Sequence, residues 1–173
     1  MKTLEEQMAF YAAYHQDARN KATHFIGVPL IMLAILVPLS WLRIDLAGFG
    51  LTAAMLLAAA VLAYYFILDL PLALAMLAVI GLLIWLAEAI AGLGTARGWA
   101  WFGALFVGGW ILQLVGHAFE GRKPALADNL FQIFVAPMFL AAEVFFALGY
   151  KPELHQRIKL SSTARRAPSA PSA

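Results

Sequence analysis

Four apolar stretches separated by short polar segments constrain this chain more than any other feature of its sequence. They cover residues 24–41, 46–68, 72–91 and 99–115. A helix needs about 20 apolar residues to cross the hydrocarbon core of a bilayer. Inside that core every backbone N–H and C=O group must be paired, and a helix pairs them within one segment. We therefore expect an all-α fold, a polytopic membrane helix bundle with about four transmembrane helices.

The composition excludes an ordinary soluble domain and argues against a nucleic-acid partner. Hydrophobic residues make up 63% of the 173 residues and charged residues only 13%, whereas soluble domains have about 25% charged residues. The net charge is only +2, and the basic residues are scattered at the ends of the apolar runs. This distribution is typical of membrane orientation signals rather than of a surface that binds DNA or RNA. The lipid bilayer is the partner that the composition predicts.

An N-terminal amphipathic helix is expected to precede the first span. Within residues 3–20, Leu4, Met8, Tyr11 and His15 recur at helical spacing, and acidic residues occupy the first turn. Acidic side chains at that position stabilise a helix through its dipole. We expect this helix to lie at the membrane surface.

A fifth apolar run, residues 130–148, contains Pro137 and Glu143 and is close to the minimum length for a span. With a cytoplasmic N-terminus and four spans, only Arg43 and Arg97 of the 12 basic residues lie outside. A fifth crossing would move the basic C-terminal segment outside as well, against the positive-inside rule. We therefore predict a re-entrant or interfacial helix for this run.

The chain is expected to form one integral membrane domain over residues 1–150. Residues 151–173 are basic and end in small and polar residues with two prolines, SSTARRAPSAPSA. Such a segment has little apolar surface to bury. We predict a disordered tail.

Three of the four histidines are predicted to lie at one membrane face. His24 opens the first span, His117 closes the fourth, and His15 precedes the first. The chain has no cysteine, and imidazole suits iron, zinc, copper or nickel. Glu120 follows His117 by three residues, which places both on one face if the helix continues. This pattern favours a transition-metal site, to which Asp128 and Asn129 of the next loop can add ligands or hydrogen bonds to ligands.

Structural roles remain open for the same residues. A single histidine near a membrane interface is more often an anchor than a ligand. Glu120 with Arg122 and Lys123 has the pattern of a solvated, salt-bridged loop. Glu143 lies inside an apolar run, where a carboxylate usually faces the protein interior or a polar cavity.

Two segments resemble a known family. YAAYHQDARNKATHFIGVPL, residues 11–30, and WILQLVGHAFEGRKPALADNLFQIFVAPMFLAAE, residues 110–143, resemble the 2-hydroxy-palmitic acid dioxygenase family. The resemblance covers about residues 5–150, and the middle spans match in hydropathy only. It implies an iron(II)-dependent dioxygenase that uses O2 to shorten a 2-hydroxy fatty acid by one carbon. This is the alpha-oxidation step of sphingoid-base and fatty acid metabolism, and 2-oxoglutarate is not required.

The resemblance also implies residue roles. His15, His24 and His117 match the family's motif histidines and are the expected catalytic Fe(2+) ligands, with Glu120 next. Asn20, Gln113, Asp128 and Asn129 match polar motif positions and are expected to orient ligands or to hold the substrate. The substrate's negative charge has four candidate partners, between which the sequence does not choose: Arg19, Lys21, Arg122 and Lys123.

A second function class remains open. In a non-enzymatic membrane protein that binds lipid or acts as a scaffold, the histidines anchor the chain and the basic face binds anionic lipid. That alternative predicts no bound metal. The composition is compatible with a bacterial inner membrane, and the resemblance implies the endoplasmic reticulum if the source is eukaryotic. Chain-length preference and oligomeric state are not visible in the sequence.

Overall fold

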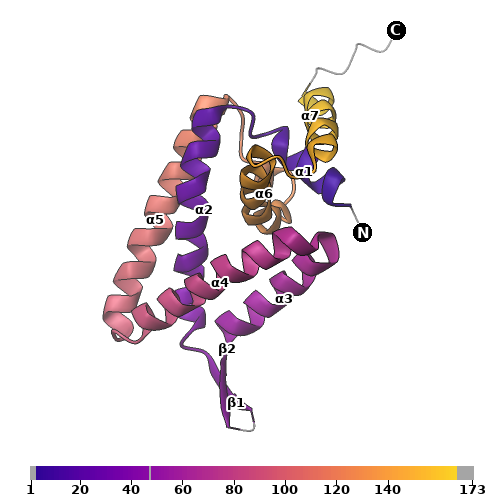
Figure 1. Ribbon diagram of the computed structural model, residues 1–173. Helices are drawn as coiled ribbons and strands as arrows, with labels where there is room; N and C mark the ends of the chain where they lie inside the picture. The colour runs from indigo at the N-terminus through magenta and orange to yellow at the C-terminus, as the bar shows by residue number, and fades with distance from the viewer. Residues whose placement is uncertain (1–2, 47, 167–173) are drawn as a thin grey trace.

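The computed structural model describes residues 3–46 and 48–166 and is almost entirely helical over them. The all-α prediction is confirmed, with one short hairpin as the exception (Figure 1). The elements in chain order are α1 (Leu4–Ala12), α2 (Ala18–Leu39), β1 (Arg43–Leu46), β2 (Phe49–Thr52), α3 (Ala53–Leu68), α4 (Leu70–Ala91), α5 (Thr95–Glu120), the 3-10 turn η1 (Ala125–Ala127), α6 (Gln132–Ala147) and α7 (Pro152–Arg166).

Helices α2 and α5 run side by side along most of their length (Figure 1). Glycines permit this close approach. A Cβ atom built on Gly109 would lie 2.6 Å from Cγ1 of Ile31 and 3.0 Å from the carbonyl oxygen of Gly27. Small residues at a helix contact allow two backbones to approach in this way. The pair of helices forms the frame on which the rest of the fold is placed.

Helices α3 and α4 form a helical hairpin, which crosses beside α2 (Figure 1). Asp69 separates the two helices and caps α4, because its Oδ1 accepts a hydrogen bond of 3.2 Å from the Leu72 backbone N–H. Its Oδ2 lies 2.5 Å from Nζ of Lys151, in the α6–α7 connection. The main apolar core lies between this hairpin and α1, α6 and α7; it includes Met8, Tyr65, Met76, Phe139 and Ile158.

Within the described residues, three helices are long and apolar enough to cross a membrane: α2, α4 and α5, with 22, 22 and 26 residues. Helices α3 and α6 are apolar but shorter, with 16 residues each. The protein is therefore a membrane helix bundle, and the number of crossings stays a prediction.

The second apolar run begins with a hairpin instead of a helix. The expectation of a span from residue 46 is wrong at residues 46 and 48–52, because Leu46 ends β1 and residues 49–52 form β2, which pairs antiparallel with β1. Gly48 in the connection has φ +85°, a conformation that glycine adopts readily and that a helix does not contain. Thr52 then caps α3 by accepting a hydrogen bond from the Met55 N–H.

The N-terminal helix is shorter than predicted. Helix α1 ends at Ala12, and residues 13–17 turn before α2 begins, so the expectation of one helix over residues 3–20 is wrong at residues 13–17. Asp17 starts α2 by accepting a hydrogen bond of 2.8 Å from the Arg19 N–H. Met8 and Tyr11 of α1 are 1% and 4% exposed. The apolar face of α1 is thus covered by the protein itself.

The prediction of a disordered C-terminal segment is wrong for residues 152–166, which form α7. Leu154 and Ile158 are four residues apart, so they share one face of this helix and pack into the main core beside α1. Arg157 pairs with Glu5 of α1 at 3.0 Å. The remaining part of that prediction, residues 167–173, lies outside the described residues.

The α2–α5 contact gives a matched pair of test substitutions. Gly109→Ala is expected to destabilise the protein by roughly 1–3 kcal/mol, because the added methyl group overlaps Ile31. Gly108→Ala is the control, since a Cβ atom there meets nothing within 4 Å, and alanine favours helix over glycine. Thermal unfolding in a neutral detergent measures both. Equal melting temperatures for the two variants would contradict the close contact.

Candidate metal centre

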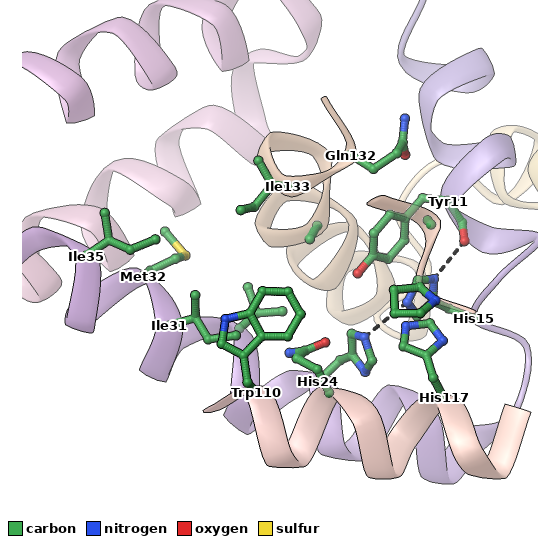
Figure 2. Close-up of a pocket in the computed structure, with 15 residues that line it drawn as sticks. Tyr11, His15, His24, Ile31, Met32, Ile35, Trp110, His117, Gln132 and Ile133 are labelled. Atoms are coloured by element: carbon green, nitrogen blue, oxygen red, sulfur yellow. Dashed lines mark hydrogen bonds between the residues drawn. The ribbon is translucent and has the colours of Figure 1, made fainter. Parts of the chain in front are cut away.

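The three histidines predicted to share a membrane face come together in one buried cluster. His15 lies in the turn between α1 and α2, His24 in the second turn of α2, and His117 in the last turn of α5 (Figure 2). One ring nitrogen from each lies within 4.8 Å of the others. The side chains are 2%, 2% and 6% exposed. Helix α5 continues to Glu120, as the i, i+3 argument required.

The hydrogen bonds of two histidines fix which ring nitrogen carries a lone pair. Nδ1 of His15 is 2.8 Å from the carbonyl oxygen of Tyr11, and Nδ1 of His24 is 2.9 Å from that of Asn20. A carbonyl oxygen only accepts, so both Nδ1 atoms are donors. In neutral imidazoles both Nε2 atoms therefore carry lone pairs, and they face each other at 3.1 Å.

Two lone pairs at this distance repel each other unless a cation lies between them. A proton is disfavoured at His15, because burial holds the pKa of its imidazole well below the ordinary value. A metal ion removes the conflict, since two nitrogens bound at about 2.1 Å to one ion lie about 3 Å apart. His117 supplies a third nitrogen that can bind the ion, because its Nδ1 is buried and has no hydrogen-bond partner in the described part of the chain. The residues thus fit a transition-metal ion, and three imidazoles suit iron, zinc, copper or nickel.

An aromatic ring fixes His15 from the side. The Tyr11 ring is stacked on the imidazole with centroids 3.9 Å apart and planes within 3°. Burial raises the pKa of the Tyr11 phenol, so its hydroxyl stays protonated and neutral. The phenol reaches the same cavity as the histidines.

Glu120 and Asn20 position the turn that carries His15. Oε2 of Glu120 accepts hydrogen bonds from the backbone N–H groups of Gln16 at 3.0 Å and Asp17 at 2.8 Å. It also accepts one from Nδ2 of Asn20 at 3.1 Å. A Cβ atom on Gly116 would overlap Asn20, so glycine is required there for α2 and α5 to meet at the cluster. Glu120 lies beside the histidines, but this oxygen binds the His15 turn.

An apolar groove leads away from the histidines between α2, α5 and α6. On α2 its lining follows one helix face from His24 through Val28, Ile31 and Met32 to Ile35 (Figure 2). Trp110 of α5 and Ile133 of α6 line the other sides. The groove has a volume of about 90 Å³. It can hold the reacting end of an amphipathic molecule but not a long acyl chain in full.

Two buried amides face this groove with unpaired polar atoms. Nε2 of Gln113, one turn before His117, and Oε1 of Gln132 have no hydrogen-bond partner among residues 3–46 and 48–166. Their side chains are 7% and 2% exposed. An unpaired buried donor or acceptor costs about 1–3 kcal/mol. A ligand with both donor and acceptor groups would offset this cost.

Two of the predicted polar positions are engaged elsewhere. Asp128 accepts a hydrogen bond from the Tyr14 hydroxyl at 2.5 Å and pairs with Lys123 at 2.5 Å, which lowers the pKa of its carboxyl. Asn129 accepts one from the Phe131 N–H at 3.0 Å. Neither lines the groove. They hold the loop beside the site.

Sequence reasoning missed Tyr11, Trp110 and Gln132 as residues of the site. Gln132 offered a signal, because it is a polar residue inside an otherwise apolar run, FQIFVAP. Tyr11 and Trp110 offered none, since aromatic residues are common in membrane helices at positions without a site.

Comparison with known proteins gives two findings. The family described as 2-hydroxy-palmitic acid dioxygenase Mpo1-like matches residues 1–148. A curated protein named 2-hydroxy-palmitic acid dioxygenase, from Saccharomyces cerevisiae, is 37% identical over 153 residues, which cover 87% of this chain and 84% of the relative. No solved structure matches.

The cluster predicts which histidines hold metal. His15→Ala, His24→Ala and His117→Ala are each expected to lower the affinity for a divalent transition metal by 100-fold or more, since loss of a neighbour of a ligand already costs about 10- to 100-fold. His155→Ala is the control, because His155 is exposed, stacks on Phe146 and is not one of the three clustered histidines. Metal content after dialysis against a graded chelator measures the affinities. Equal retention by all four variants would rule out this centre.

Proposed function

The chain belongs to the 2-hydroxy-palmitic acid dioxygenase Mpo1-like family, and we propose that it is an iron(II)-dependent dioxygenase that shortens 2-hydroxy fatty acids by one carbon with O2. The observation that carries the proposal is that the Nε2 atoms of the buried His15 and His24, each with a lone pair, lie 3.1 Å apart. Both histidines line one end of the apolar groove. A metal centre at the end of an acyl-binding groove is what this reaction needs.

The reaction balances without a further co-substrate. Conversion of a 2-hydroxy acid to CO2 and the acid one carbon shorter breaks the bond between C1 and C2 and releases four electrons. Reduction of one O2 takes up four electrons, so that one oxygen atom leaves in water and the rest in the two carbon products. This stoichiometry explains why neither 2-oxoglutarate nor an external reductant is needed.

His15, His24 and His117 are the proposed ligands of the ion. Bound there, iron(II) supplies the one-electron chemistry that lets O2 react with an organic substrate, and three protein ligands leave positions for substrate and O2. The backbone carbonyls of Tyr11 and Asn20 hold the Nδ1 protons of His15 and His24, which directs both Nε2 lone pairs to the ion. The stacked Tyr11 ring keeps the His15 plane in position.

Glu120 and Asn20 are proposed as positioning residues. The sequence had suggested Glu120 as a ligand, but its Oε2 already accepts three hydrogen bonds that tie the His15 turn to α5. Its buried negative charge also favours a cation nearby. Asp128 and Asn129 do not contact the ion in this proposal; they hold the loop after α5 in place.

The substrate is proposed to enter with its tail along the groove. Nε2 of Gln113 is an unpaired buried donor beside His117 and is suited to an oxygen atom of the 2-hydroxy acid. The groove volume of about 90 Å³ accommodates only the first carbons of the tail. Met32, Ile35 and Trp110 are half-buried, so the rest of the tail passes between them into the bilayer. The bilayer is thus the source of the substrate; a bacterial inner membrane, or the endoplasmic reticulum in a eukaryote, remains part of this proposal.

The direct test is turnover by the purified protein. Anaerobic loading with Fe(II), addition of 2-hydroxypalmitate and then O2 is expected to give the acid one carbon shorter, detected by mass spectrometry. The product should be absent without iron and lost in His15→Ala, His24→Ala and His117→Ala. Folded, iron-loaded protein that leaves the substrate unchanged would overturn the proposed reaction. Failure to bind any metal would favour a lipid-binding or scaffold protein.

Filling the groove tests where the tail lies. Ala136→Phe is expected to lower kcat/KM for 2-hydroxypalmitate by about tenfold or more, because Ala136 is 8% exposed and lines the groove. Its iron content should stay unchanged. Ala104→Phe on α5 is the matched control, since Ala104 is exposed. Unchanged turnover by Ala136→Phe would place the tail elsewhere.

A further inference from the structure

A second cavity lies beside His15, apart from the apolar groove. Its volume is about 370 Å³, and it is bordered by the start of α2, by α6 and by α7. Its lining is more polar than that of the groove: Lys21, Glu143, Lys159 and Thr163 lie there beside the apolar Ala12 and Ile158. With the Lys21–Glu143 pair neutral, Lys159 leaves the cavity with a positive charge, which favours an anion.

Among the described residues, His15 lines both cavities. One proposed iron ligand thus stands between an apolar groove and a polar, basic chamber. A molecule with an apolar tail and an anionic head fits such a pair, with its tail on one side of the ion and its head on the other. A 2-hydroxy fatty acid has such an apolar tail and an anionic carboxylate.

Four cations were candidate partners of the substrate's negative charge, and three of them have partners outside this chamber. Arg19 pairs with Asp17 at 3.0 Å, and Lys123 pairs with Asp128 at 2.5 Å. Arg122 donates to the carbonyl oxygen of Ala13 at 2.9 Å and lies over the Tyr14 ring. Within the described residues, Lys21 is the one of the four that lines a cavity together with a proposed ligand.

Lys21 is oriented by Glu143 and keeps donors for a ligand. Its Nζ donates to Oε2 of Glu143 at 2.7 Å, and the two side chains are 28% and 20% exposed. An ammonium group has three N–H donors, so two remain. Nζ lies 5.9 Å from the Phe139 ring, whose centroid is 6.2 Å from that of His15. Lys21 and His15 both line the chamber.

We propose that this polar chamber is the head-group subsite and that Lys21, positioned by Glu143, binds the carboxylate of the 2-hydroxy acid. The inference rests on the proposed function and adds the orientation of the bound substrate. The carboxylate faces α7, the tail follows α2 and α5, and the carbon–carbon bond that breaks lies at the histidines between them. Helix α7, which closes the chamber with Lys159 and Thr163, becomes part of the site.

The test separates charge recognition from folding. The ligands are 2-hydroxypalmitate and hexadecane-1,2-diol, a neutral molecule that keeps the two adjacent oxygen atoms and the tail. Binding of each is measured under anaerobic conditions to the iron-loaded protein in a neutral detergent. Lys21→Met is expected to weaken binding of the acid by about 10- to 100-fold, which is what a charge-assisted hydrogen bond contributes. Diol binding should stay unchanged, and Lys21→Arg should restore much of the acid affinity.

Arg19→Met is the matched control, because Arg19 lies on the same helix turn as Lys21 but pairs outside the chamber; it should bind both ligands as the unaltered protein does. Equal loss of acid and diol in Lys21→Met would show a structural role, and unchanged acid binding would show no contact. Either result overturns the head-group assignment while leaving the proposed reaction intact. If the unaltered protein binds iron but not the acid, the proposed function itself is overturned.

Discussion

The close contact between α2 and α5 is the constraint on which the site depends. Gly27 and Gly109 let the two backbones approach, and Gly116 leaves room for Asn20 at the end where the cluster forms. Only at this separation do His24 and His117 reach one point, with ring centroids 5.0 Å apart. The same two helix faces continue away from the cluster as walls of the apolar groove. One helix pair thus sets both the metal centre and the path of the tail.

Several polar atoms in this interior have no hydrogen-bond partner within the described residues, and this shortage supports the proposed function. Two imidazole nitrogens face each other with lone pairs at 3.1 Å, and atoms of Gln113 and Gln132 lie buried and unpaired in the described structure. Each of these groups is costly in an apolar surrounding. A metal ion bound to the imidazoles and a ligand with several oxygen atoms would offset this cost. The unpaired atoms therefore indicate the kind of ligand that the site binds.

His15 connects the parts of the proposed mechanism. It comes from a turn rather than a helix, and Glu120 holds that turn to α5 through two backbone N–H groups. Its ring is stacked on Tyr11 and it borders both cavities. The apolar groove matches the tail of an amphipathic substrate, and the basic chamber matches its anionic head. Helices α1 and α7, which pack together outside the bundle, complete the chamber side.

The sequence by itself determined the local features: apolar runs of membrane length and three histidines at one membrane face. These follow from hydropathy, charge and helical periodicity, which act over a few residues. Tertiary structure decided the rest, because it depends on contacts between distant residues. Glu120 meets a turn more than a hundred positions earlier, α7 is ordered by packing on α1, and Lys21 is distinguished from three other cations by the chamber it lines. The β1–β2 hairpin was missed for a different reason, since an apolar run of that length fits a strand as well as a helix until its turn geometry is known.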